Sequence, residues 1–101
     1  MKTGESLIWV LYDITADKKR TRAAKACLEA GLYRVQQSVF LGTIQSNRLD
    51  ELAMQIEALI DPDKDRVYLF PMCEMDFKKV ILQGQAFDAK LVRDEVRNLF
   101  L

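Results

Sequence analysis

Apolar residues along this chain gather into short runs and helical stripes that alternate. The run Leu7–Tyr12 is rich in β-branched and aromatic residues and too short for a helix, so it predicts a strand that ends at Asp13. A helix is expected from about 18 to 30, with Thr15 or Asp17 as its N-cap. Its core stripe consists of Ala23, Ala24, Cys27 and Leu28.

The second half of the chain continues the alternation. The segment 33–43 predicts a second strand, in which Tyr33, Val35, Val39 and Leu41 share the core face and Arg34, Gln36, Ser38 and Phe40 share the other. Ser46 then caps a second helix with a stripe formed by Leu49, Leu52, Ala53, Ile56, Leu59 and Ile60. The proline and aspartates of 61–65 predict a turn. Further strands are expected at 66–71 and 80–83.

This order is close to β-α-β-β-α-β and predicts a ferredoxin-like α+β domain, a four-stranded antiparallel sheet with two helices on one face. Residues 1–84 form the expected core domain, and 85–101 form a tail that is either a helix or a partner-docking arm. The runs at 7–12, 67–70 and 80–82 are apolar on both faces, which predicts cover on both sides. A homodimer would supply that cover. The alternative is that the C-terminal segment folds back over its own sheet.

Composition removes several kinds of chemistry. The 101 residues suit one domain, half of them are hydrophobic and 30% are charged, and there is no histidine. Without histidine, zinc sites of the Cys/His type and catalysis by a histidine base are excluded. Cys27 and Cys73 are the only cysteines and are expected to be buried free thiols. The longest apolar run is too short to span a membrane, and we expect a cytoplasmic protein.

Charge is segregated although the net charge is zero. Residues 1–50 hold eight basic and five acidic residues, whereas residues 51–101 hold seven basic and ten acidic residues. The basic residues of the first half cluster at Lys18, Lys19, Arg20, Arg22 and Lys25. Cations oppose the dipole at a helix N-terminus, so contact with phosphates is one explanation and a solvated charged face is the other.

Asp13 is the candidate for catalysis, because it ends an apolar strand where a rigid scaffold meets solvent. One carboxylate is a poor magnesium site, but two copies of Asp13 facing each other across a two-fold axis could hold Mg²⁺ or Mn²⁺. The alternative is that Asp13 only caps the following loop. Glu74 and Asp76 follow the 66–71 strand and could approach Asp13 at the same sheet end.

Several stretches resemble the CRISPR-associated protein 2 family. They are Val10–Ile14, Arg20 with Arg22, Gly31–Phe40, Asp65–Pro71 and Val80–Gly84, which cover about residues 6 to 84 in the correct order. The resemblance implies a ferredoxin-like homodimer that serves antiviral defence. It implies magnesium-dependent endonuclease activity on RNA or duplex DNA, and a scaffold that bridges the CRISPR-associated protein 1 integrase during spacer integration.

By position, the resemblance makes Asp13 the catalytic residue and the ligand of a metal held between the two subunits. The residues implied in substrate binding are Tyr12, Arg20, Arg22, Arg34, Ser38 and Phe40. The tail after Gly84 departs from the family, in which this region often adds a strand to the partner subunit, because 88–100 looks more helical.

Three functions remain open on the sequence. The first is a metal-dependent phosphodiesterase that requires Asp13. The second is a non-catalytic adaptor that binds DNA and bridges integrase subunits. The third is a ribonuclease toxin similar to virulence-associated protein D. No residue pattern marks contact with a 2′-hydroxyl, so DNA and RNA both remain possible substrates.

Overall fold

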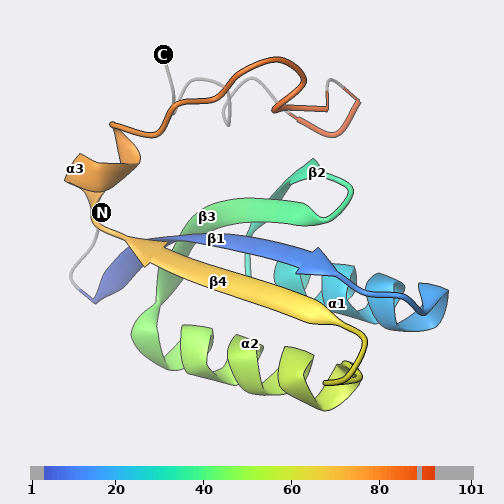
Figure 1. Cartoon of the computed structure of the whole chain (residues 1–101). Helices are drawn as coiled ribbons and strands as arrows, with labels where there is room; N and C mark the ends of the chain where they lie inside the picture. The colour runs from blue at the N-terminus through green and yellow to red at the C-terminus, as the bar shows by residue number, and fades with distance from the viewer. Residues whose placement is uncertain (1–3, 89, 93–101) are drawn as a thin grey trace.

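Two helices cover one face of a four-stranded antiparallel sheet, and a short third helix lies on the opposite side (Figure 1). The computed structural model describes residues 4–88 and 90–92. The elements are β1 Glu5–Asp13, α1 Asp17–Glu29, β2 Tyr33–Gln36, β3 Val39–Gln45, α2 Ser46–Leu59, β4 Arg66–Met72 and α3 Glu74–Phe77. The order β1-α1-β2-β3-α2-β4 confirms the expected ferredoxin-like fold.

Strand β1 is central, since the strand order is β2-β3-β1-β4. It pairs antiparallel with β3 and with β4. In the β4 pairing, Asp13 lies opposite Arg66 and Leu7 lies opposite Met72. The end of β1 therefore meets the start of β4.

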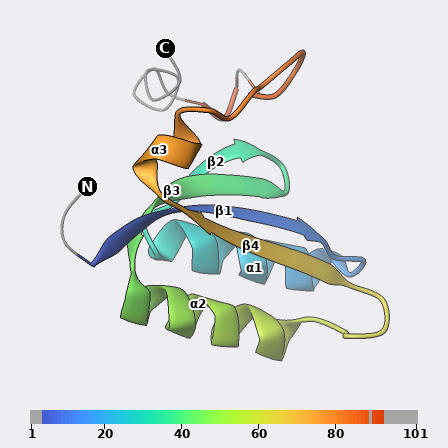
Figure 2. The ribbon, with the colours of Figure 1, turned by 60° about the vertical axis from the view of Figure 1, so that its left-hand side comes forward.

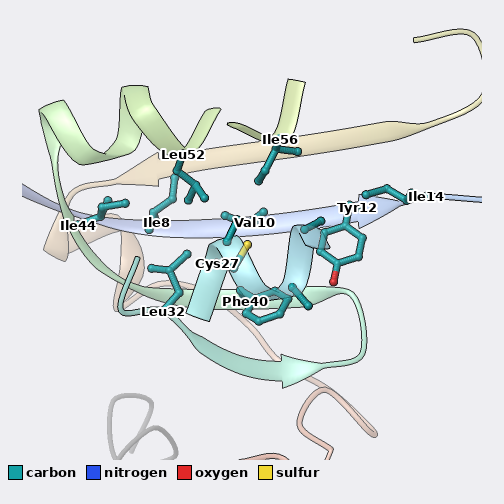
Figure 3. Packing of buried hydrophobic residues seen from close by; sticks show 13 residues of the cluster. Ile8, Val10, Tyr12, Ile14, Cys27, Leu32, Phe40, Ile44, Leu52 and Ile56 are labelled. Atoms are coloured by element: carbon teal, nitrogen blue, oxygen red, sulfur yellow. The ribbon is translucent and has the colours of Figure 1, made fainter. Parts of the chain in front are cut away.

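The larger core lies between the sheet and the two long helices. Alternate residues of β1 (Ile8, Val10 and Tyr12) point toward the helices, as the period of a strand requires (Figure 3). They pack with buried residues of both helices and of the other strands, including Ala23, Cys27, Phe40, Ile44, Leu52 and Ile56. Burial of this continuous apolar surface is the main force that holds the helices on the sheet.

The opposite face of the sheet, here called the open face, carries a smaller cluster. Its buried members are Leu7, Val35, Leu41 and Phe77. Helix α3 and the segment that follows it lie over this face, on the side away from α1 and α2 (Figure 2). The Asp88 amide donates to the Val35 carbonyl at 2.8 Å. The chain therefore folds back over part of its own sheet, as one of the two alternatives expected.

The segment 33–43 is not one strand but a hairpin, which corrects the sequence expectation. Gln37 and Ser38 form its turn, and the pairing shifts between Arg34 and Gln36. The expected alternation holds, but the two faces are exchanged, and Phe40 lies in the helix-side core. No glycine, proline or asparagine marks this turn, so the apolar alternation ran through it unbroken.

The segment 80–83 is irregular, so the strand expected there is absent. The sheet still has four strands, because the segment expected as one strand at 33–43 supplies two of them, β2 and β3. The last strand of the sheet is β4. After β4 the chain turns through α3 and leaves the plane of the sheet. At the end of this turn the Val80 amide donates a hydrogen bond to the Phe77 carbonyl at 3.2 Å. The helix expected at 88–100 falls mostly outside the described residues.

Smaller corrections concern helix ends and thiols. The N-cap residues of α1 and α2 are Ala16 and Gln45, and neither side chain makes a capping hydrogen bond. Cys27 is buried as expected, whereas Cys73 is exposed at the junction of β4 and α3. Leu28 is half exposed, not part of the core. No helix in the described part of the chain is long and apolar enough to cross a membrane.

Candidate nucleic-acid interface

A groove of about 880 Å³ opens beside the end of β1, between α1 and the β2–β3 hairpin. It is lined by Tyr12, Asp13, Ile14, Asp17, Arg20, Thr21, Ala24, Lys25, Leu28, Arg34, Gln37 and Ser38. Five of the residues expected to act on nucleic acid are thus brought together: Tyr12, Asp13, Arg20, Arg34 and Ser38.

Asp13 is the last residue of β1 and is exposed. It follows Leu11 by two positions, so both lie on the open-face side of the strand. Among the residues that the structure describes, no hydrogen bond or ion pair engages its carboxylate, which leaves it available to a cation. Glu74 and Asp76 do not approach it, because β4 runs antiparallel and carries them past the opposite end of β1.

Tyr12 points to the other side of β1 and connects the strand to the hairpin. Its hydroxyl donates to the Gln37 carbonyl at 3.4 Å, and its ring lies 6.1 Å from that of Phe40. Burial raises the pKa of Tyr12, and the nearby Arg34 opposes that rise. The phenol therefore stays neutral and positions the hairpin.

Arg34 is held in place by its own hairpin. Its Nε and Nη2 donate to the Gln37 carbonyl at 3.0 and 2.6 Å. Its guanidinium carbon lies 5.4 Å from the centre of the Phe40 ring, within the range of a cation–π contact. The Phe40 ring, which the resemblance implied in substrate binding, is fully buried beneath Arg34 and does not line the groove.

Arg20 is held from the opposite side of the groove. Its Nη1 donates to the carbonyls of Ile14 and Thr15 at 3.2 and 3.4 Å, and it forms an ion pair with Asp17. Both groove arginines are thus ordered by backbone carbonyls, and such preorganised guanidiniums suit phosphate contacts. Arg22 is exposed on α1 but does not line the groove.

The comparison with known families now decides the classification. The sequence model described as CRISPR associated protein Cas2 matches residues 6–80. The chain belongs to the Cas2 family.

Individual Cas2 proteins agree with this assignment. The "CRISPR-associated endoribonuclease Cas2" of Desulforudis audaxviator is 36% identical over 69 residues, which cover 68% of this chain and 65% of the relative. The protein of the same name from Korarchaeum cryptofilum is 32% identical over 78 residues, covering 77% of this chain and 84% of the relative. The aligned region thus spans just under two thirds of the first relative's length.

A solved Cas2 structure shares the fold. The crystal structure of Streptococcus pyogenes Cas2 superposes with a TM-score of 0.64 at 22% identity, covering 77% of this chain and 99% of that one. This likeness bears on the ferredoxin-like architecture alone.

The groove also contains Thr21 and Gln37, which the sequence did not single out. Thr21 and Lys25, a member of the basic cluster named from the sequence, extend its wall along α1, and Gln37 closes it at the hairpin. The spacing of four between Thr21 and Lys25 is the signal that could have identified Thr21. Gln37 carries no such signal, because its role depends on the unmarked turn.

The described residues of a single chain offer few ligands for a divalent metal. In residues 4–88 and 90–92, no group of three His, Cys, Asp or Glu side chains could hold a metal ion. Asp17 lines the groove, but Arg20 neutralises it. Among the described residues that line the groove, Asp13 is therefore the one carboxylate without an ion pair, and an octahedral ion would need a second copy of the chain to supply another.

Proposed function

We propose that two copies of this Cas2-family chain form a dimer that binds nucleic acid in the groove and hydrolyses a phosphodiester bond. A divalent metal, Mg²⁺ or Mn²⁺, would be held by the two Asp13 carboxylates. The observation that carries the proposal is the meeting of Asp13, Arg20 and Arg34 at one groove.

The groove has the chemistry that a phosphate backbone requires. Arg20 and Arg34 lie on opposite walls, and backbone carbonyls hold both guanidiniums in place. Ordered arginines bind phosphate with little further loss of side-chain entropy. The names of the relatives, which call them endoribonucleases, favour RNA as the first substrate to test.

The open face supports a dimer. Tyr68 and Phe70 of β4 stack at 6.0 Å and remain 51% and 49% exposed. Beside them lies an apolar hollow of about 360 Å³ lined by Trp9, Leu11, Phe70, Pro71, Met72, Val80 and Leu82. Exposed apolar surface of this kind is typical of an interface. Asp13 lies at the edge of the same face. A two-fold dimer formed through this face would therefore bring the two Asp13 side chains toward each other.

The chain's own groups would divide the work. Asp13 of each copy would hold the ion, while Arg20 and Arg34 bind and orient the phosphate. Bound there, the ion would supply the Lewis acidity that activates water and stabilises negative charge on the phosphate. No histidine is available as a general base anywhere in the sequence, which agrees with a metal-activated water.

The test compares the wild type with Asp13→Asn and with Asp50→Asn, which removes another exposed carboxylate, on α2, that does not line the groove. Each protein is incubated with labelled single-stranded RNA and with duplex DNA, in Mg²⁺ and in EDTA. Cleavage in Mg²⁺ by the wild type and Asp50→Asn, but not by Asp13→Asn, supports the nuclease. Cleavage that survives in EDTA or in Asp13→Asn contradicts it.

A second candidate is a non-catalytic scaffold that binds DNA and bridges the CRISPR-associated protein 1 integrase. The observation that favours it is the single uncommitted carboxylate per chain at the groove. A scaffold needs the groove arginines but not Asp13. Asp13→Asn that still supports spacer integration with the integrase, while Arg34→Ala does not, would favour the scaffold over the nuclease.

A further inference from the structure

Asp65 is the one charged residue that is buried in the described part of the chain. It lies in the turn between α2 and β4, directly before Arg66. The backbone of Arg66 lies opposite that of Asp13 in the pairing of β4 with β1. The Asp65 Oδ1 accepts a hydrogen bond from the Thr15 amide at 3.0 Å, and its Oδ2 accepts one from the Asp61 amide at 2.8 Å. The carboxylate thus bridges two loops that are far apart in sequence.

The two bonds have different roles. The bond to Asp61 closes the turn in which Asp65 itself lies. The bond to Thr15 does nothing for that turn, since Thr15 is 50 residues away in the loop between β1 and α1. It instead satisfies the backbone amide of Thr15, which lies two residues before the first residue of α1.

The loop that receives this bond is the one that positions the groove residues. Thr15 follows Asp13 by two residues, and its carbonyl and that of Ile14 accept from Arg20. The loop is therefore held by two side chains. The Asp65 carboxylate accepts from its Thr15 amide, and the Arg20 guanidinium donates to its carbonyls. The Asp65 contact therefore acts on the loop that follows Asp13 and carries the carbonyls that hold Arg20.

We infer that Asp65 is a positioning residue for the groove, which fixes the loop between β1 and α1 and thereby the directions of Asp13 and Arg20. Its consequence for cleavage rests on the proposed nuclease function, whereas its consequence for the loop does not. The Asp61 and Thr15 amides also hold the pKa of Asp65 below its usual range, so both of its oxygens are acceptors at neutral pH.

The matched variants are Asp65→Asn and Asp63→Asn. Both remove one negative charge from the same turn, but the Asp63 side chain is exposed and makes no hydrogen bond among the described residues. Asparagine at 65 keeps one acceptor and turns an NH₂ group toward the other amide, so either the Thr15 bond or the Asp61 bond must break. Asp65→Ala removes both acceptors and therefore breaks the Thr15 bond in every case.

The first readout is hydrogen exchange of the Thr15 amide, measured by NMR on each full-length variant without metal. We expect exchange at least about tenfold faster in Asp65→Ala than in the wild type, because a bond to a buried charged acceptor is lost. Asp63→Asn should match the wild type. Unchanged protection of Thr15 in Asp65→Ala, or of both Thr15 and Asp61 in Asp65→Asn, would overturn the inference.

The second readout separates positioning from folding. At a temperature where all variants are folded, Asp65→Asn should weaken RNA binding without metal and raise the Mg²⁺ concentration for half-maximal cleavage, each by about three- to tenfold. A purely structural role would lower only the folded fraction, so unchanged RNA binding and metal dependence would contradict positioning. If the wild type cleaves nothing, the nuclease proposal fails, and RNA affinity together with Thr15 exchange still decides the role of Asp65.

Discussion

The two faces of the sheet differ in how completely they are covered. On the helix face, the core includes Ile8, Val10 and Phe40 with no exposed surface at all. On the open face, Leu7 and Leu41 are buried under α3 and the segment after it, whereas Phe70 of β4 is half exposed. The same central strand contributes to both faces. The difference teaches that the helix face holds the fold together, while the open face leaves apolar surface exposed on β4.

The sharpest contrast should appear in the two thiols. Burial raises the pKa of Cys27, in the helix-side core, to about 12, whereas Cys73 is exposed. The reactive species is the thiolate, so at pH 8 we expect Cys27 to be alkylated at least about a thousandfold more slowly than Cys73. Mass spectrometry of timed samples measures both rates, with urea-unfolded protein as control. Similar rates in the folded protein would show that the helix face opens readily.

The next largest effect should come from truncation in the helix-side core. Leu52 of α2 is fully buried, so Leu52→Ala should destabilise the fold by about 3 kcal/mol through lost burial and the cavity left behind. Met54→Ala on the same helix, at a side chain that is 70% exposed, is the control and should change stability by less than about 0.5 kcal/mol. Urea denaturation measures both. Equal losses would mean that the two sides of α2 are equally packed.

A smaller effect should distinguish the open face. Replacing both Tyr68 and Phe70 with alanine should weaken dimer formation by at least about tenfold, because stacked aromatics dominate interface energies. The stability of the separated chain should barely change, since both side chains are half exposed. Sedimentation at a series of concentrations measures the dissociation constant. A wild type that stays monomeric throughout would show that the open face does not mediate dimerisation.

The smallest effect concerns acid. Backbone amides of Asp61 and Thr15 lower the pKa of Asp65, so its ionised form stabilises the folded state. That contribution is complete above the pKa of an unfolded aspartate, about 3.9, and is lost as the pH falls through the lower folded value. The difference in urea midpoint between the wild type and Asp65→Asn should be constant above about pH 5 and shrink below about pH 4. A difference that grows on acidification would have the wrong sign for this mechanism.

Much of the fold could be predicted from local pattern. The strand ending at Asp13, the two helices and the strand at 66–71 follow from apolar periodicity, which depends only on near neighbours in sequence. The hairpin at 37–38 could not be predicted, because its turn carries no residue that favours one. Alternation divided the residues around Phe40 correctly between two faces, but only packing decides which face the helices cover.

The site was predictable where it is local and not where it is distant. Asp13 and Arg20 are close in sequence, and a strand end followed by a basic helix indicated both. The role of Gln37 depends on the hairpin, and that of Asp65 on a bond to Thr15 across 50 residues. No periodic pattern reports a contact of that separation.

The long reach of Asp65 also has a consequence for how the protein is made. A nascent chain that has emerged only as far as Leu59 contains α1, the hairpin and α2, but neither β4 nor the carboxylate that holds Thr15. Contacts between distant residues form late, because the intervening chain must first close a long loop. The loop between β1 and α1 is thus expected to become fully ordered only after residues 65–72 have been made and β4 has docked.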